Sequence, residues 1–523
     1  MSAQHVSEPV DYIVVGAGAA GSVLAARLSE DPSASVLLLE AGTALEGSAF
    51  SVPALALTLQ NPDSPWFWGD SSTPQPGLGG RSVPLLAARA LGGGSAINGM
   101  LWSRGNAADY DGWAAAGAKD WSWADVATVF ERVEHFETTS PERGVGGPMA
   151  ISTPRHVDAW SSLVAAAADS AGLKMNPDYN SGVNDGLGSV QSNIRDGSRH
   201  SVLDGYLNPA LGRKNLTVVT GARVDKIQFE GTTATGVEVS GSVTGVLKAQ
   251  RAVVLTAGAL RSPQILLRSG VGPVEHLREA GVRVVHDLPG VGQNLQDHPL
   301  ITGAWTTTLP IGGPGVTPER QYELLRRGPL STNFQISAWH RLAAEALAPD
   351  VQFSFVSYPV SAGGEPRTPT SVIVAVAMLL NPHSRGQVKL RSADPAERPW
   401  VDLGILSDDR DLRTLAEGLN WLREKMFRET TLAEHVGEPI RPPADSDMDA
   451  YVRENATSSW HFAGTCRIGD DPHAVVRPDL AVHGLQGLYV ADASVMPTVP
   501  RGNPQAPTIM IAERAATFIR FSS

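Results

Sequence analysis

The chain has 523 residues, of which 53 are glycine and 37 are proline, without the regular glycine repeat of a collagen. An apolar content of 42% is too high for a disordered chain, and a net charge of −12 argues against a protein that binds nucleic acid. The single cysteine, Cys466, excludes an internal disulfide and a cysteine-based metal site, and we expect no bound metal.

The start of the chain and its apolar runs bear on targeting. Residues 1–9 carry neither the basic segment nor the apolar segment of a secretory signal. The longest apolar run, Val372–Leu380, is far shorter than the roughly 20 residues that cross a bilayer as a helix. We therefore expect a soluble, cytoplasmic protein with no membrane partner.

The first predicted element is a buried strand over residues 11–15, which the glycine-rich stretch Gly16–Gly21 follows directly. Residues 22–29 then place apolar side chains at helical spacing, and a second short strand over 36–39 ends in Glu40. A strand, a Gly-x-Gly-x-x-Gly turn, a helix and an acidic residue about 20 positions further on form the fingerprint of a dinucleotide-binding unit.

Each glycine of this stretch has its own function in such a unit. Gly16 permits the tight turn, Gly18 lets a pyrophosphate approach the backbone, and Gly21 allows the helix to pack closely on the strand. The free N–H groups at the start of the helix favour a diphosphate, and Glu40 can accept hydrogen bonds from ribose hydroxyls. The motif does not separate NAD from FAD, but its place near the N-terminus and the ending Glu40–Gly42 favour FAD.

Further motifs follow in chain order. They lie at Arg89–Met100, Gly258–Gly272, Val291–His298, Trp460–Gly469 and Asp492–Pro504. The first of them is a second glycine-rich stretch that is unlike a hairpin turn, and the third leads into an Asp-His pair.

In this order and at these spacings, the motifs resemble those of the glucose–methanol–choline (GMC) oxidoreductases, a family of FAD-dependent enzymes. The resemblance extends from about residue 10 to the C-terminus and includes Pro382–Val388 and Asp394–Pro399. It implies an α/β (α+β two-domain) fold, with a Rossmann-like FAD-binding domain around a parallel sheet and a substrate-binding cap with an antiparallel sheet. The FAD-binding domain would be discontinuous, comprising residues 1–155, 197–300 and 456–523, and the substrate-binding domain would comprise 156–196 and 301–455.

The resemblance also implies which residues hold FAD. Ile97 stands where some relatives attach the flavin covalently through a histidine, so we expect a non-covalent cofactor. Val224 matches the position whose backbone meets the adenine, and Trp68 lies near an insert that lines the flavin in relatives. The predicted cofactor-binding residues are Gly16, Gly18, Ala19, Ala20, Gly21, Glu40, Ala41, Trp68, Leu91, Gly92, Gly93, Ser95, Asn98, Gly99, Met100, Val224, Trp460, Asp492, Ala493, Asn503 and Pro504.

Two residues match the family's catalytic positions. His461 is the expected base, because a neutral imidazole can accept the hydroxyl proton of an alcohol while the flavin takes a hydride from carbon. Asn503 cannot act as a base, but its NH2 group can hydrogen-bond the alcohol oxygen. We expect a substrate pocket lined by four aromatic residues: Phe353, Phe355, Trp460 and Phe462.

The predicted cap segment has strand-like runs at 351–358 and 371–378, and the first alternates large residues with small or polar ones, as does a sheet with one face on a cavity. Residues 408–419 predict a helix with an acidic start. The loops at 311–316 and 361–366 are candidate lids or passive surface turns.

The resemblance implies oxidation of a primary alcohol to the aldehyde, with hydride transfer to flavin and reduction of O2 to H2O2. The pair His461 and Asn503 resembles that of the choline oxidase and 5-hydroxymethylfurfural oxidase branches. The aromatic residues and the similarity to the hydroxymethylfurfural oxidase branch favour aryl or furanic alcohols. One alternative is an alcohol or choline-type dehydrogenase with a quinone or other acceptor. A second is a flavin-containing hydroxynitrile lyase, although such lyases have histidine at the position of Asn503, and a third is a flavin-retaining binding protein. The oligomeric state, monomer or homodimer, is left open.

Overall fold

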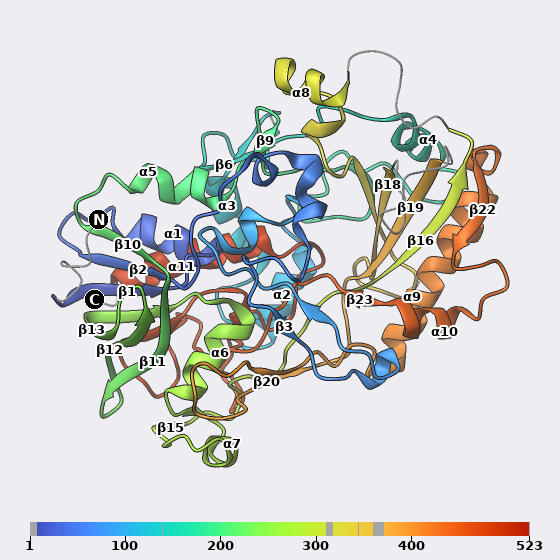
Figure 1. The fold of residues 1–523 in the computed structure, drawn as a ribbon. Coiled ribbons are helices and arrows are strands. Elements are labelled where there is room, and N and C mark those ends of the chain that lie inside the picture. Colours follow the sequence, from blue (N-terminus) through green and yellow to red (C-terminus); the bar gives the residue numbers. More distant parts are fainter. Residues whose placement is uncertain (1–7, 139, 310–316, 344, 359–370, 522–523) are drawn as a thin grey trace.

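The computed structural model describes residues 8–138, 140–309, 317–343, 345–358 and 371–521, and its two large sheets lie on opposite sides of the molecule (Figure 1). The candidate lid at 311–316 and the candidate lid at 361–366 lie outside the described residues. Within those residues, no helix is both long enough and apolar enough to span a membrane.

The first sheet has a parallel core in the order β10, β2, β1, β13 and β24, and β12 and β11 extend it as antiparallel strands. The second half of β13 pairs with β1 and β24, and its first half pairs with β12. Every residue of β2 is buried, as expected for a parallel strand covered on both faces. The bounds are β1 Val10–Val15, β2 Val36–Glu40, β10 Leu216–Thr220, β11 Ala222–Glu230, β12 Thr233–Gly241, β13 Gly245–Leu255 and β24 Leu488–Val490.

Two helices cover the parallel part of this sheet, α1 (Ala19–Leu28) and α11 (Gln505–Phe521), and they lie side by side in Figure 1. Helix α1 starts three residues earlier than the apolar spacing predicts, because Gly18 is its N-cap and the end of the glycine-rich turn is already helical. Arg27 of α1 binds Glu513 of α11 at 3.0 Å and so joins the two helices.

The second sheet is antiparallel, in the order β22, β16, β19, β18, β17 and β7, and β23 pairs with the start of β16. Parallel and antiparallel sheets in one chain confirm the predicted fold class. The predicted domain boundaries stay a prediction. The bounds are β7 Gly186–Ser189, β16 Pro299–Thr307, β17 Ile336–His340, β18 Val351–Tyr358, β19 Ser371–Leu379, β22 Val436–Arg441 and β23 Thr457–Ser458.

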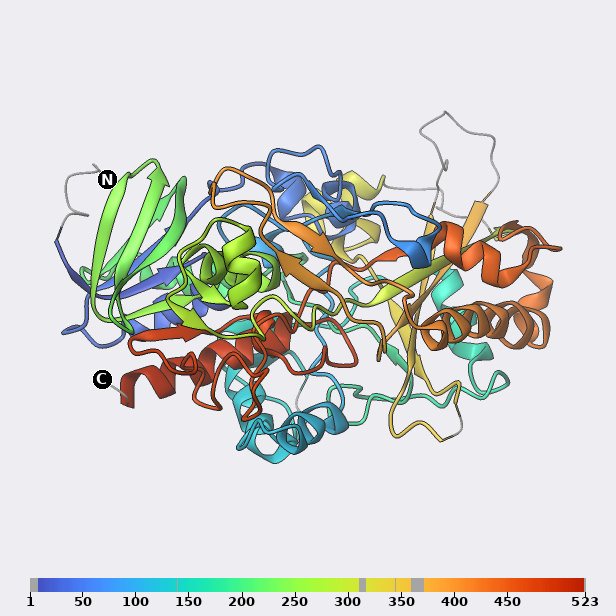
Figure 2. The same cartoon turned by 90° about the horizontal axis from the view of Figure 1, so that it is seen from below.

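The two faces of the second sheet have different surroundings. Helices α9 (Asp409–Trp421) and α10 (Met448–Asn455) cover the outer face, which points away from the first sheet (Figures 1 and 2). Phe353 and Phe355 point to this outer face, are at most 1% exposed, and belong to the core between sheet and helices. The ring of Phe353 stacks on that of Trp421 in α9, with centroids 5.0 Å apart.

The inner face carries the alternate residues of the same strands. Thr302 of β16 pairs with Val376 of β19, Val376 pairs with Ser354 of β18, and Ser354 Oγ lies 2.9 Å from Ser337 Oγ. Thr302 and Val376 are half-buried, whereas the outer face is closed by helices. The prediction that Phe353 and Phe355 line the substrate pocket is therefore wrong, because alternation along a strand sends them to the outer face.

The remaining α-helices and strands surround these two sheets. They are β3 Asp70–Ser71, β4 Pro84–Leu85, α2 Ala107–Ala115, α3 Trp123–Val133, β5 Glu134–Phe136, β6 Met149–Ile151, α4 Ala159–Ala167, β8 Ile194–Arg195, β9 Ser198–Arg199, α5 Asn208–Ala210, α6 Gly258–Arg268, β14 Val271–Gly272, α7 Val274–Glu279, β15 His286–Asp287, α8 Pro318–Leu325, β20 Gln387–Lys389 and β21 Trp400–Asp402.

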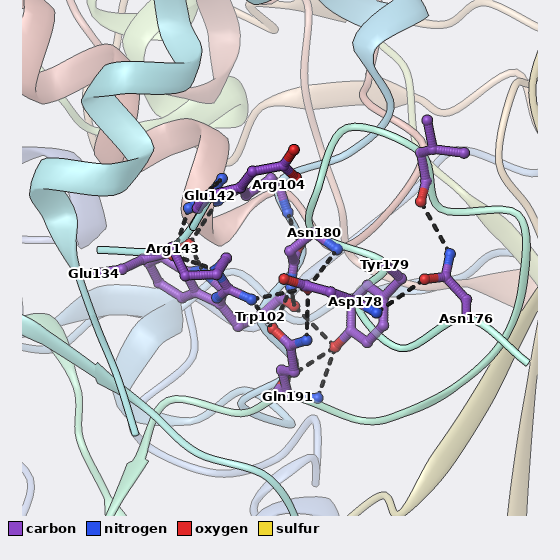
Figure 3. A network of polar contacts seen from close by, with 11 residues as sticks. Trp102, Arg104, Glu134, Glu142, Arg143, Asn176, Asp178, Tyr179, Asn180 and Gln191 are labelled. Atoms are coloured by element: carbon purple, nitrogen blue, oxygen red, sulfur yellow. Dashed lines mark hydrogen bonds and ion pairs between the residues drawn. The ribbon is translucent and has the colours of Figure 1, made fainter. Parts of the chain in front are cut away.

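A buried polar network connects the segment that precedes β7 to β5 and to the segment between β4 and α2 (Figure 3). Glu134, which is 0% exposed, accepts hydrogen bonds from Arg104 Nη2 at 2.6 Å and from Arg143 Nε at 2.7 Å. Arg143 also binds Asp178 at 3.0 Å. Burial alone would raise the pKa of Glu134, but the two arginines lower it below its usual value.

Replacing Glu134 with glutamine is expected to destabilise the protein by about 3–5 kcal/mol, because two buried guanidinium groups lose their shared charge partner. Urea unfolding followed by circular dichroism measures this change. Lys425→Ala, which removes one partner of the exposed Lys425–Glu429 pair, is the matched control and should change stability little. Equal effects of the two substitutions would contradict the importance assigned to the buried network.

Candidate active site

A cavity of about 260 Å³ opens at the carboxyl ends of β1 and β2. Its lining includes both glycine-rich turns, and Trp460 and Phe462 also belong to it. Of the predicted cofactor-binding residues, those that line it are Gly16, Gly18, Ala19, Ala20, Glu40, Ala41, Trp68, Gly93, Val224, Trp460, Asp492 and Ala493. Residues from five motifs far apart in the sequence are thus brought to one cavity.

The two glycine-rich turns pack directly against each other at the edge of this cavity. A Cβ atom added at Gly93 would come within 2.7 Å of the Cα atom of Gly18, so the approach requires glycine. A Cβ atom at Gly18, by contrast, would meet only Gly93 Cα, at 3.9 Å, and otherwise points into open space. This open space beside the N-terminus of α1 suits a diphosphate that must lie against the backbone.

Glu40 lies at the end of β2 and is 6% exposed. Its carboxylate accepts hydrogen bonds from the N–H groups of Ala17, at 2.9 Å, and of Gly42, at 2.7 Å. Burial raises the pKa of this carboxyl, and the two N–H groups oppose the rise. Glu40 therefore holds the first turn in shape as well as lining the cavity.

The other predicted cofactor residues lie beside the cavity lining. Gly21 packs on Gly16, where an added Cβ would come within 1.8 Å of the carbonyl oxygen, and Gly92 donates its N–H to Ala17 O. Asn98 accepts a hydrogen bond from Arg199 Nη1 at 2.8 Å. The predicted residues outside the lining are Gly21, Leu91, Gly92, Ser95, Asn98, Gly99, Met100, Asn503 and Pro504.

His461 and Asn503, predicted from separate motifs, lie together. His461 is in the loop that follows β23, and Asn503 precedes α11. Asn503 Nδ2 lies 3.2 Å from His461 Nε2, and both side chains are half-buried. A hydroxyl oxygen placed beside the two nitrogens, within reach of both, would accept a hydrogen bond from the amide and donate one to the imidazole.

Asn503 is held by a partly buried ion pair that Arg501, two residues before it, forms with Asp109. The N–H of Arg501 donates to Asp109 Oδ2 at 2.8 Å, and the Arg501 guanidinium binds Asp109 Oδ1. Asp109 is part of the capping box at the start of α2. The segment that carries Asn503 is thereby fixed to a helix terminus.

Asp297, which was not predicted from the sequence, binds the main chain of the loop that carries His461. Asp297 Oδ1 accepts the N–H of His298 and the N–H of His461, each at 2.8 Å, and the hydroxyl of Ser458 donates to Oδ2. Burial raises the pKa of Asp297 to about 6 against these hydrogen bonds. Between Ser458 and His461 the backbone of Trp460 is left-handed, with φ +57°, which is rare for a bulky residue.

Two other residues were also missed: His298 at the site and Phe334 beside the second glycine-rich stretch. His298 Nδ1 lies 2.9 Å from His461 Nδ1, and its ring stands at 90° to that of His461. Phe334 lies against Gly99, where an added Cβ would be 3.1 Å from its ring. The motif that ends in His298 was visible in the sequence, but no local pattern shows which residue it meets 163 positions later.

The family model described as GMC oxidoreductase matches this chain in two parts, over residues 10–300 and over residues 382–512. The chain is a GMC oxidoreductase. It is 36% identical over 530 residues to the oxygen-dependent choline dehydrogenase of Brucella ovis, covering 97% of this chain and 95% of that one. The corresponding protein of Rhizobium etli is 37% identical over 531 residues, with the same coverage.

Solved structures of this GMC oxidoreductase's relatives agree over nearly the whole chain. Pyridoxine 4-oxidase from Mesorbium loti superposes with a TM-score of 0.88 and 31% identity, covering 97% of this chain and 98% of its own. A fungal aryl-alcohol oxidase gives a TM-score of 0.84 and 25% identity, with coverages of 98% and 99%. The predicted family and the FAD cofactor are confirmed: the protein is an FAD-dependent oxidoreductase that acts on the CH–OH group of alcohols.

Proposed function

We propose that the protein oxidises a neutral primary alcohol to the aldehyde and passes the electrons to O2, which is reduced to H2O2. The observation that carries this proposal is the pairing of His461 with Asn503 at 3.2 Å, beside a cavity built from two glycine-rich turns. FAD would be held without a covalent bond, because Ile97 has no nucleophile to offer.

FAD, when bound, supplies the acceptor for the hydride that leaves the alcohol carbon. The protein's part is to place the alcohol and to manage its proton. Asn503 donates a hydrogen bond to the alcohol oxygen, and His461 Nε2 accepts the hydroxyl proton. Burial lowers the pKa of His461 to about 4, so the imidazole is neutral and ready to accept a proton at pH 7.

The surroundings of this pair favour an apolar, uncharged substrate. Trp460 and Phe462, the chain neighbours of His461 on either side, both line the cavity. The carboxylate next to His461 is that of Asp297, whose oxygens are already taken by Ser458 and by two main-chain N–H groups. These features support an aryl or furanic alcohol over choline, the substrate named for the Brucella and Rhizobium relatives.

An oxygen electrode with a coupled peroxide assay tests this proposal. The holoenzyme is given benzyl alcohol, 5-hydroxymethylfurfural and choline in separate runs. We expect O2 uptake matched by H2O2 with the aryl and furanic alcohols, and slower uptake with choline. Reduction of an added quinone without O2 uptake would overturn the oxidase assignment in favour of a dehydrogenase, and faster uptake with choline would overturn the substrate class.

A further inference from the structure

The imidazole of His298 forms a hydrogen bond with that of His461. Their Nδ1 atoms are 2.9 Å apart, and His298 is 0% exposed. A hydrogen bond between two imidazole nitrogens needs one N–H and one lone pair. One of the two Nδ1 atoms therefore carries a proton and the other does not.

The contact with Asn503 indicates which of the two Nδ1 atoms carries the proton. The Nδ2 group of Asn503 can only donate, and it lies 3.2 Å from His461 Nε2, so Nε2 must offer its lone pair. A neutral His461 then has its single proton on Nδ1 and donates it to His298 Nδ1. The proton of neutral His298 is left on its own Nε2.

The charges around the two rings favour this neutral arrangement. Burial lowers the pKa of His461 to about 4, and burial together with the neighbouring His461 lowers the pKa of His298 well below its usual value. Two ionic groups face the pair. The carboxylate of Asp297 accepts hydrogen bonds from the main-chain N–H groups of both histidines. The positive charge of Arg501, which is paired with Asp109, lowers the pKa of His298 further.

The main chain on both sides of the ring pair is already fixed. One oxygen of Asp297 binds the N–H of His298 and the N–H of His461, and His298 O accepts the N–H of Ser459 at 3.0 Å. These contacts place the two backbones but leave the His461 ring free to turn about its side-chain bonds. Two side-chain contacts fix the orientation and the tautomer of the ring: Asn503 donates to Nε2, and His298 accepts at Nδ1.

We propose that His298 is a positioning residue that keeps His461 in the tautomer with an unprotonated Nε2 and accepts its Nδ1–H throughout the reaction. The inference rests on the proposed function of His461 as the base. When the alcohol O–H bond breaks, its proton would form a bond to His461 Nε2, and FAD, if bound, would supply the acceptor for the hydride from the carbon. His461 becomes a cation whose Nδ1–H still donates to His298, so the hydrogen bond becomes charge-assisted and stronger.

The test compares two substitutions at His298 by anaerobic stopped-flow reduction of the flavin with an alcohol that the wild-type enzyme oxidises. His298→Asn keeps an acceptor oxygen near the position of Nδ1, whereas His298→Leu removes it at similar size. We expect His298→Leu to slow flavin reduction at least tenfold, but by no more than the roughly 10²–10⁴-fold that loss of a general base costs, and His298→Asn to recover most of the rate.

The pH profile separates positioning from a general structural effect. The reduction rate rises with pH as His461 loses its proton, because only the neutral form can accept the alcohol proton. Without an acceptor for its Nδ1–H, the protonated form of His461 is less stable, so the pKa of His461 falls. The acidic limb of the pH–rate profile should therefore move to lower pH in His298→Leu but not in His298→Asn. His483→Leu, which removes another ring contact, to Gly469 O at 3.0 Å, is the control and should leave the limb in place.

Three outcomes would overturn the inference: an unchanged rate in His298→Leu, equal losses in both variants, or a slower rate with an unmoved acidic limb. Nitrogen-15 NMR of the histidine-labelled holoenzyme gives a readout that needs no turnover. It should show His461 protonated at Nδ1 in the wild type, and protonation at Nε2 would contradict the inference even if no alcohol proved to be a substrate. Failure of the wild-type enzyme to oxidise any alcohol would instead count against the proposed function.

Discussion

Replacing His461 with alanine is expected to leave a folded, yellow protein whose flavin is reduced by alcohol about 10²–10⁴-fold more slowly than in the wild type. The imidazole is the group placed to take the hydroxyl proton, and its Nε2 lies 3.2 Å from the amide that would hold the alcohol oxygen. Alanine leaves the main-chain N–H that Asp297 binds, so the loop itself should keep its position.

The measurement is the rate of flavin reduction in anaerobic stopped-flow, with the absorption spectrum as the check on FAD content. His473→Ala is the control, because His473 is exposed. It should reduce its flavin at the wild-type rate. A His461→Ala enzyme that retains near-normal reduction would refute the assignment of the base.

Replacing Gly18 with alanine is expected to give a soluble, folded protein that loses most of its FAD. An added Cβ meets no protein atom closer than 3.9 Å, and the backbone φ of −76° suits alanine. The methyl group would instead occupy the space left for the cofactor's diphosphate. We expect the affinity for FAD to fall at least tenfold, which corresponds to about 1.4 kcal/mol.

FAD titration of the apoprotein, followed by flavin fluorescence, measures this loss. Gly112→Ala is the control, since Gly112 lies in α2 with no atom near its added Cβ, and it should keep its FAD. Gly21→Ala provides the contrast, because its Cβ would lie 1.8 Å from Gly16 O and should prevent correct folding. Wild-type affinity in Gly18→Ala would mean that the diphosphate does not pass this turn.

The nucleotide-binding part of the fold could be predicted from the sequence because its determinants are local. Two strands, one turn and one helix follow each other within residues 10–40, and the positions of Gly16, Gly18 and Gly21 depend on backbone geometry alone. Only the boundaries differed: α1 begins at Ala19, three residues earlier than expected, and β1 and β2 are each one residue longer.

The substrate side could be predicted less well. Alternation along residues 351–358 predicts a strand with two unlike faces, but it does not say which face turns toward the catalytic site. That choice depends on the helix α9, whose Trp421 packs on Phe353 from the outer side. Helix packing thus places Phe353 and Phe355 in the core and leaves the smaller residues facing inward.

The roles of His298 and Asp297 depend on contacts across the fold. Asp297 is joined to His461 through a hydrogen bond between residues 164 positions apart. The sequence shows an Asp-His pair at the end of a motif, but only the folded chain brings both residues into contact with His461. Their spacing in the sequence carries no signal of this contact.

The most direct test of the whole account is a single-turnover experiment with the holoenzyme and benzyl alcohol in the absence of O2. We predict that the flavin absorption bleaches, that deuterium at the alcohol carbon slows the bleaching, and that admitting O2 restores the colour with one equivalent of H2O2. A flavin that stays oxidised with benzyl alcohol and 5-hydroxymethylfurfural alike would contradict the account.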